Sequence, residues 1–286
     1  MTTIAVILAS RGRPKRALGA ILAMQVLASG EHDVRYILAC DDDDPADTAG
    51  FFANFADPSI VVACGPRPSG ASACWNRCVG LVDADIFVTM TDDAVMATAN
   101  WDEAISYVFR HHTWVHPSLA MAALNDTANQ GQATLFVFKR AWYDLCGLFD
   151  ERFPMWFSDT AIAETYSFIT GEMIGILPVT AVLKPDVFNP RLRDMRLWWQ
   201  LYACTRLERI ETARKARDAL GLPKPDNLDE LIDMWKRRDT KGLPDSEEIV
   251  RQMAVKKPPD ERYMEAYRNA ISYVQEHAHA AAHLNA

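Results

Sequence analysis

The sequence predicts an α/β fold with a mostly parallel sheet flanked by helices, followed by a helical C-terminal region. In the first half, short and nearly all-apolar runs alternate with helical patterns, as in strands buried on both faces of a parallel sheet. Beyond residue 191 the pattern is mainly helical and is interrupted by loops that contain proline or glycine. The 286 residues, 49% of them hydrophobic, suffice for a large domain with an appendage. We therefore expect one domain over 1–190 and a helical region over 191–286.

The first half is expected to follow the order βαβαβαβ, which implies right-handed crossovers and a parallel, doubly wound core. A polar loop, "SRGRPKR", follows the first strand, and Gly30 closes the first helix. The expected strands are "TIAVILA" (3–9), "VRYILAC" (34–40), "SIVVAC" (59–64) and "DIFVTM" (85–90), and the expected helices are 17–29, 48–55 and 71–82.

The pattern becomes mixed after about residue 100. Two strands are expected between helices, and a loop and a further helix follow them. The expected elements here are helix 101–112, strands 118–125 and 133–140, a short helix and loop over 141–153, and helix 158–171. The helices expected beyond them are 192–220, 228–238, 246–253 and 260–282.

The net charge of −8 argues against a general binder of polyanions. The charge is uneven, since residues 1–190 carry 12 basic and 22 acidic side chains and residues 191–286 carry 18 and 16. The stretch Arg191–Arg217 holds eight basic residues and three acidic ones. A solvated helix face is the favoured interpretation, and a local basic surface that faces phosphates is the alternative.

No apolar stretch approaches the roughly 20 residues that a membrane-spanning helix needs. The apolar run near the N-terminus has no basic residues before it, which favours a buried first strand over a signal peptide and a cytoplasmic protein over a secreted one. None of the six cysteines forms a C-x-x-C pair, so we expect small buried thiols in a reducing compartment.

Polar clusters follow three of the expected parallel strands: "SRGRP" after the first, "DDDDP" after the second and "TDD" after the fourth. Ligands of open parallel sheets bind beyond the carboxyl ends of the strands, where these clusters would gather. No G-x-G-x-x-G turn is present, which argues against a dinucleotide site. The acidic clusters favour a nucleotide held by its base and ribose, with Mg²⁺ or Mn²⁺ masking the diphosphate.

These segments resemble the GT-A superfamily of nucleotide-sugar glycosyltransferases. The resemblance covers roughly residues 3–185, and it is closest to the large inverting family that has Asp-x-Asp and Glu-Asp motifs. It implies a GT-A (Rossmann-like) sheet, a nucleoside-diphosphate sugar as donor and a divalent cation. The segments that carry it are "IAVILASRGRP", "ACDDDDP", "GASACWNRCV", "IFVTMTDDAV", "CGLFDERF" and "FSDTAIAE", in that order.

The resemblance assigns the metal to "TDD", which stands where the family has its Asp-x-Asp motif. Asp93 would bind the cation that bridges the donor diphosphate, and Asp92 would lie toward the ribose or sugar. The first acidic position of the motif is Thr91 here, which departs from the family pattern. Many relatives add a histidine ligand after the last core strand, where Asp186 would be the substitute in this chain, and the alternative there is Lys184 facing the diphosphate. The alternative for the aspartate pair is a solvated turn.

The resemblance also assigns the nucleotide contacts. Ser10 and Arg11 occupy the loop that lines the nucleotide, and either Asp41 or Asp42 would accept a hydrogen bond from the base. This last assignment favours a uridine nucleotide. For the other two aspartates of "DDDD", loop solvation or helix capping is preferred.

Asn76 and Arg77, on the expected helix 71–82, match a family segment that lines the nucleotide pocket. A role in helix packing is the alternative for both residues. Asp150 and Glu151, in "GLFDERF", are expected to shape the acceptor loop rather than to act in catalysis.

Asp159 matches the aspartate of the family's Glu-Asp motif, with Ser158 in place of the glutamate. In an inverting transfer, this carboxylate would take the proton of the acceptor hydroxyl as its oxygen attacks the anomeric carbon. Both residues are also typical helix N-caps, and one residue can serve both roles. Glu164 is the fallback carboxylate.

The leading hypothesis is therefore a metal-dependent inverting glycosyltransferase that uses a nucleoside-diphosphate sugar, with a uridine one favoured. A nucleotidyltransferase is a second possibility, although the loop after the first strand lacks the usual glycines. A non-catalytic nucleotide-sugar-binding relative is a third. The acceptor stays open between a glycan, a lipid-linked sugar, a protein and a hydroxylated base in DNA.

Overall fold

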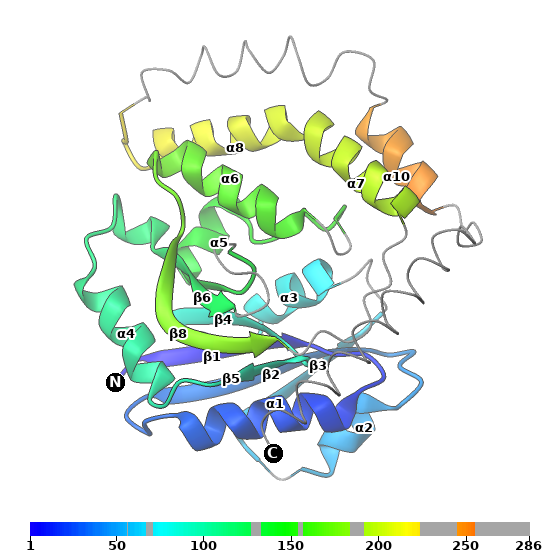
Figure 1. Cartoon of the computed structure of the whole chain (residues 1–286), viewed down its shortest axis with the longest axis vertical. Coiled ribbons are helices and arrows are strands. Elements are labelled where there is room, and N and C mark those ends of the chain that lie inside the picture. Colours follow the sequence, from blue (N-terminus) through cyan, green and yellow to red (C-terminus); the bar gives the residue numbers. More distant parts are fainter. Residues whose placement is uncertain are drawn as a thin grey trace, which may run out of the picture.

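The computed structural model describes residues 1–55, 57–66, 71–126, 133–153, 157–183, 192–223 and 245–254. It shows an α/β fold with an eight-stranded sheet of order β3-β2-β1-β4-β7-β6-β8-β5 and helices on both faces (Figure 1). The predicted α/β class is confirmed. The sheet is mixed: four of the seven strand pairings in the described residues are parallel, and three are antiparallel.

The first half has the predicted order, with parallel pairings of β1 with β2, β1 with β4 and β2 with β3. Every strand ends within one or two residues of its predicted position, because the apolar runs are the residues buried in the sheet. The first helix begins earlier than predicted, with Pro14 in its first turn, where proline is favoured. The elements are β1 (Thr3–Ala9), α1 (Pro14–Leu27), β2 (Asp33–Asp41), α2 (Thr48–Ala53), β3 (Ile60–Gly65), α3 (Ala71–Val79) and β4 (Ile86–Thr91).

The second half makes the sheet mixed. The strand β7 runs antiparallel to both β4 and β6, β8 runs parallel to β6, and β5 runs antiparallel to β8. The elements are β5 (Ala94–Met96), α4 (Trp101–His111), the 3₁₀ turn η1 (Pro117–Leu119), β6 (Met121–Asp126), β7 (Phe136–Lys139), α5 (Arg140–Cys146), α6 (Ser158–Thr170) and β8 (Gly175–Leu183).

Two hydrophobic cores lie on the two faces of the sheet. On one face, α1 and α4 pack against alternate residues of the central strands, with Ile21 and Trp101 fully buried. On the other face, α3, α5, α6 and α8 (Arg206–Ala219) cover the sheet through side chains such as Trp142 and Ile169. Figure 1 shows α1 and α3 on opposite sides of the strands. This arrangement leaves the carboxyl ends of the parallel strands to the connecting loops.

The C-terminal helices α7 (Leu192–Cys204) and α8 replace the single helix predicted over 192–220. Thr205 separates them, and its Oγ1 donates to the carbonyl of Leu201 at 2.6 Å. Ala213 and Ala216 of α8 are buried in the core beside α6, so this helix completes the main core. The predicted helix 246–253 is confirmed as α10 (Ser246–Ala254), whereas 228–238 and 260–282 lie outside the described residues. None of the helices within the described ranges is long and apolar enough to cross a membrane.

Three arginines of α8 contact protein groups and are largely withdrawn from solvent. Arg206 and Arg209 both contact Glu164, and Arg217 is buried and donates to two backbone carbonyls. Arg214 pairs with a glutamate of its own helix. The alternative of a phosphate-facing basic surface therefore does not fit Arg206, Arg209 and Arg217, whereas the side chain of Arg214 is 51% exposed.

Candidate functional site

The loops after β1, β2 and β4 meet at one edge of the sheet, as predicted from the parallel order. Ser10 Oγ donates to Asp92 Oδ2 at 2.7 Å, which joins the loop after β1 to the end of β4. Arg11 Nη1 donates to Asp41 Oδ2 at 2.7 Å, which joins the same loop to the end of β2. We call these four residues together with Asp93 the rim. The rim brings together polar side chains that lie far apart in the sequence.

Asp92 is the more deeply buried of the two buried carboxylates of the rim, and its side chain is 0% exposed. Its Oδ1 pairs with Arg13 Nη2 at 2.7 Å, while Ser10 occupies its other oxygen. Burial raises the pKa of Asp92, although Ser10 and Arg13 act in the opposite direction. Sequence reasoning missed Arg13, which is the second of four basic residues within "SRGRPKR". Asp92 therefore holds the loop after β1 against β4, and protein groups occupy both of its oxygens.

Asp41 and Asp42, between which the sequence could not choose, have different environments. Asp41 is buried, and within the described part of the chain its Oδ1 has no hydrogen-bond partner. Asp42 is exposed, and its backbone N–H donates to the carbonyl of Gly65. Hydrogen bonds from Arg11 to Asp43 and Asp41 raise the pKa of the guanidinium. The structure thus places Asp41 in the rim with one buried oxygen that has no hydrogen-bond partner among the described residues.

Asp44 connects the loops after β1 and β2. Its carboxylate accepts from the backbone N–H of Gly12 at 3.0 Å, from Thr48 Oγ1 at 2.6 Å and from the backbone N–H of Ala46 at 2.9 Å. Burial opposes ionisation, but these hydrogen bonds outweigh it and lower the pKa of Asp44. The N-cap of α2 is Asp47. Asp44 is therefore not the cap, and its hydrogen bonds hold the loops after β1 and β2 together.

Asn76 and Arg77 contact protein groups, as expected if both residues have a role in helix packing. The Asn76 amide donates to the carbonyl of Phe149 at 2.8 Å and accepts from its N–H at 3.1 Å, and it also donates to Glu151. Arg77 donates to two backbone carbonyls, at 3.2 and 2.6 Å, at the ends of β2 and β3. Consecutive residues of α3 therefore hold the "GLFDERF" loop and the strand ends next to the rim.

Asp159 lies in the first turn of α6 and is half-buried. The N-cap is Phe157, which has a left-handed φ of 66°, so neither Ser158 nor Asp159 is the cap that the alternative interpretation required. Asp159 Oδ1 accepts from the backbone N–H of Thr160 at 2.7 Å. Burial raises the pKa of Asp159, although that hydrogen bond acts against it. This combination suits a carboxylate that exchanges a proton.

Glu164, the fallback carboxylate, has both oxygens occupied. Arg206 Nε contacts Oε1 at 2.8 Å, and Arg209 contacts Oε2 at 2.8 Å. Its side chain is 11% exposed, and the Arg209 guanidinium also lies over the ring of Tyr202, 4.3 Å from the ring centroid. Glu164 therefore connects α6 to α8 and is not free to act as a base.

The rim offers few oxygens of its own to a metal. Asp93 is half-buried in the turn between β4 and β5, and Thr91 Oγ1 is buried without a hydrogen-bond partner in the described structure. The described residues contain no group of three or more His, Cys, Asp or Glu side chains that could hold a metal ion, and Asp186 lies outside them. Mg²⁺ is commonly bound by one or two carboxylates together with substrate phosphates. The donor set fits a cation shared with a diphosphate rather than a cage made of protein ligands alone.

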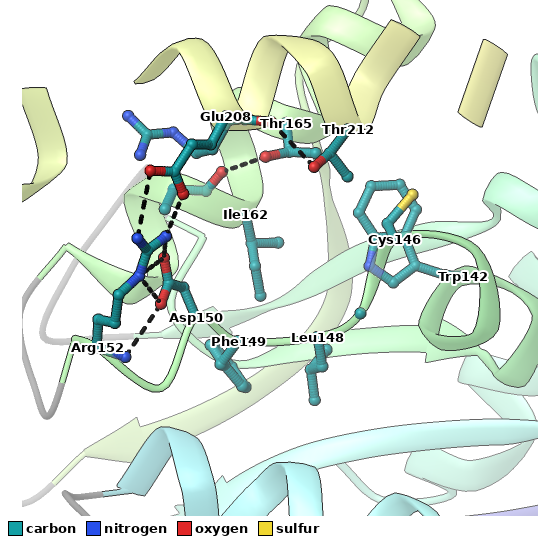
Figure 2. A pocket seen from close by; sticks show the side chains of 13 residues that line it. Trp142, Cys146, Leu148, Phe149, Asp150, Arg152, Ile162, Thr165, Glu208 and Thr212 are labelled. Carbon is teal, nitrogen blue, oxygen red and sulfur yellow. Dashed lines mark hydrogen bonds and ion pairs between the residues drawn. The ribbon is translucent and has the colours of Figure 1, made fainter. Parts of the chain in front are cut away.

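A separate cavity of about 170 Å³ lies between α5, the "GLFDERF" loop, α6 and α8 (Figure 2). Its apolar wall includes Trp142, Leu148 and Ile162. Arg152 closes one side through ion pairs of 2.6 Å with both Asp150 and Glu208. The charged groups of this wall therefore fix the loop to α8.

Neither a protein-family model nor a curated protein matches this chain. The rim can accept hydrogen bonds through Asp41 and can ligate a hard cation through Asp93. Asp159 adds a carboxylate whose environment favours proton uptake.

Proposed function

We propose that the protein is a metal-dependent inverting glycosyltransferase that moves a sugar from a nucleoside-diphosphate sugar, preferentially a uridine one, to an acceptor hydroxyl. The observation that carries the proposal is the rim itself. Its Ser10–Asp92 and Arg11–Asp41 hydrogen bonds join the three loops that the GT-A resemblance assigns to the nucleotide. Ordinary loop solvation does not explain two buried carboxylates at one sheet edge.

The donor would be held by the base at one end and by the diphosphate at the other. Asp41 Oδ1 is a buried acceptor without a partner in the described structure, and a base N–H would satisfy it. Arg11 keeps that carboxylate in place through its other oxygen. Asp93 would hold Mn²⁺ or Mg²⁺, which, when bound, supplies Lewis-acid stabilisation of the leaving diphosphate.

Asp159 would act on the acceptor. Its carboxylate takes the proton of the acceptor hydroxyl while the hydroxyl oxygen bonds to the anomeric carbon from the face opposite the leaving group. The bond between the anomeric carbon and the diphosphate oxygen breaks, and the nucleoside diphosphate leaves with that electron pair. The raised pKa of Asp159 favours proton uptake in this step.

A non-catalytic nucleotide-sugar-binding protein is the second candidate, and one observation favours it. Arg13 neutralises Asp92, the first aspartate of "TDD", at 2.7 Å, so a protein cation already performs part of the task of a metal. Thr91 and Ser158, which replace acidic residues of the family motifs, point the same way. The nucleotidyltransferase hypothesis gains no support from the described rim.

Release of the nucleoside diphosphate from a panel of sugar donors, with and without Mn²⁺, tests the proposal. The panel should hold uridine, guanosine, cytidine, adenosine and thymidine diphosphate sugars, each assayed with simple sugars and with hydroxymethylated DNA as acceptors. We expect release from a uridine donor that requires the cation and is stimulated by one acceptor. Binding of a donor without any release would favour the non-catalytic candidate, and release of pyrophosphate from a nucleoside triphosphate would favour a nucleotidyltransferase.

A further inference from the structure

Two cysteines lie opposite each other at the carboxyl ends of β2 and β3. Cys40 and Cys64 are register partners in this parallel pair, so their side chains are on the same face of the sheet. Neighbouring strands lie about 4.8 Å apart, and the two Cα atoms of a disulfide are usually about 4.4–6.8 Å apart. The register therefore brings the two thiols within the range of a disulfide without moving either strand far.

The two thiols differ in exposure. Cys64 is exposed, contrary to the expectation of buried thiols, whereas Cys40 is 0% exposed. In the described sheet β3 is an edge strand, paired only with β2. Burial, and after it the neighbouring Cys64 thiol, raises the pKa of Cys40 to about 12. A reagent in solution therefore meets Cys64 first, and Cys40 reacts only with a partner already beside it.

We propose that Cys40 and Cys64 are a redox modification site, which a small-molecule disulfide such as oxidised glutathione converts into a reversible cross-strand disulfide. The Cys64 thiolate attacks the glutathione disulfide, forms a mixed disulfide and releases one reduced glutathione. Cys40 then gives up its proton, attacks the Cys64 sulfur and releases the second glutathione. Two thiol protons and two electrons thus pass from the protein to one glutathione disulfide.

The bond would form directly beside the rim. Cys40 precedes Asp41 in β2, and its carbonyl accepts from Arg77 at 3.2 Å. A covalent link at this position would fasten the edge strand to the strand that carries the predicted base-binding aspartate. The link itself requires no glycosyltransferase activity, so its test is independent of the proposed function.

Non-reducing peptide mapping after incubation in glutathione buffers of increasing oxidising strength tests the inference. Free thiols are blocked by alkylation before digestion, and cleavage at the intervening aspartates separates the two cysteines. We expect a Cys40–Cys64 peptide pair in the wild type that disappears after dithiothreitol treatment. A wild type that carries only glutathione on Cys64, or that links Cys64 to Cys74, would overturn the inference.

Two cysteine variants test the proposed roles of Cys64 and Cys40 separately. Cys64→Ser changes an exposed side chain and is expected to leave Cys40 unmodified and the chain uncrosslinked. Cys40→Ala is expected to accumulate the glutathione adduct on Cys64, since the resolving thiol is missing. Cys146, which is half-buried on α5, is the internal control, and its modification at the same oxidant strength as Cys64 would show a general loss of protection instead of a specific site. If Cys40→Ala does not fold, the wild type and Cys64→Ser still decide the matter.

Discussion

Replacing Asp159 with asparagine is expected to reduce sugar transfer by about 10²–10⁴-fold, the usual contribution of a general base. Asparagine keeps the shape of the side chain and an oxygen for the Thr160 N–H, but it cannot take up the acceptor proton. The binding of nucleoside diphosphate should stay within about twofold of the wild type, because the rim is unchanged. Initial rates at saturating donor, together with a nucleotide titration, measure both quantities.

The pH profile separates a base from a structural carboxylate. Transfer requires ionised Asp159, so activity is lost as the pH falls through the pKa of this group. Because burial raises that pKa, the acid limb of kcat/KM should lie above the ordinary carboxyl range. Thr160→Ala removes a hydroxyl contact of 3.3 Å that lowers the pKa, so it should move this limb to still higher pH. Glu172→Gln, just beyond the other end of α6, is the matched control, and full activity of Asp159→Asn would refute the assignment.

Replacing Glu164 with glutamine is expected to lower the free energy of unfolding by roughly 3–5 kcal/mol, as happens when one partner of a buried ion pair is removed. The substitution leaves Arg206 and Arg209, whose side chains are 19% and 9% exposed, without their shared carboxylate. The contact between α6 and α8 should weaken as a result. Urea unfolding followed by circular dichroism gives the change directly.

Glu211→Gln is the control for this measurement, since Glu211 forms a salt bridge with Arg214 on the exposed side of the same helix α8. Solvent screens such a pair, and the unfolding midpoint should change little. Equal effects of the two substitutions would show that the Glu164 cluster is no more important than a surface pair. A Glu164→Gln protein that is stable but inactive would instead indicate that Glu164 takes part in catalysis.

The first half of the fold was predictable because its strands are nearly all apolar and each ends at a polar cluster. The strand β8 was not identified, because Pro178 lies within it and proline is unexpected inside a strand. A register shift against β6 between Ala123 and Asn125 accompanies this irregular strand. The antiparallel pairing of β7 could not be predicted from the sequence either, since an apolar run does not show which strand it will pair with.

The site was predictable to the level of its loops but not of each side chain. The sequence placed Ser10, Arg11 and Asp92 at one sheet edge, and the structure joins them there. The sequence could not show that Arg13 forms an ion pair with Asp92, or that the Asn76 amide donates a hydrogen bond to the "GLFDERF" loop. Both contacts join segments far apart in the chain, and residue type alone does not reveal such partners.

The proposed function requires the rim to bind a nucleoside diphosphate together with a divalent cation. Calorimetric titration with UDP, in the presence and absence of Mn²⁺, tests it most directly. We expect binding that depends on Mn²⁺ and weakens about tenfold or more in Asp41→Asn, given the usual strength of a hydrogen bond to a charged group. The exposed neighbour should tolerate the same change, so Asp42→Asn should bind like the wild type. Failure of the wild type to bind UDP under either condition would refute the proposed nucleotide site.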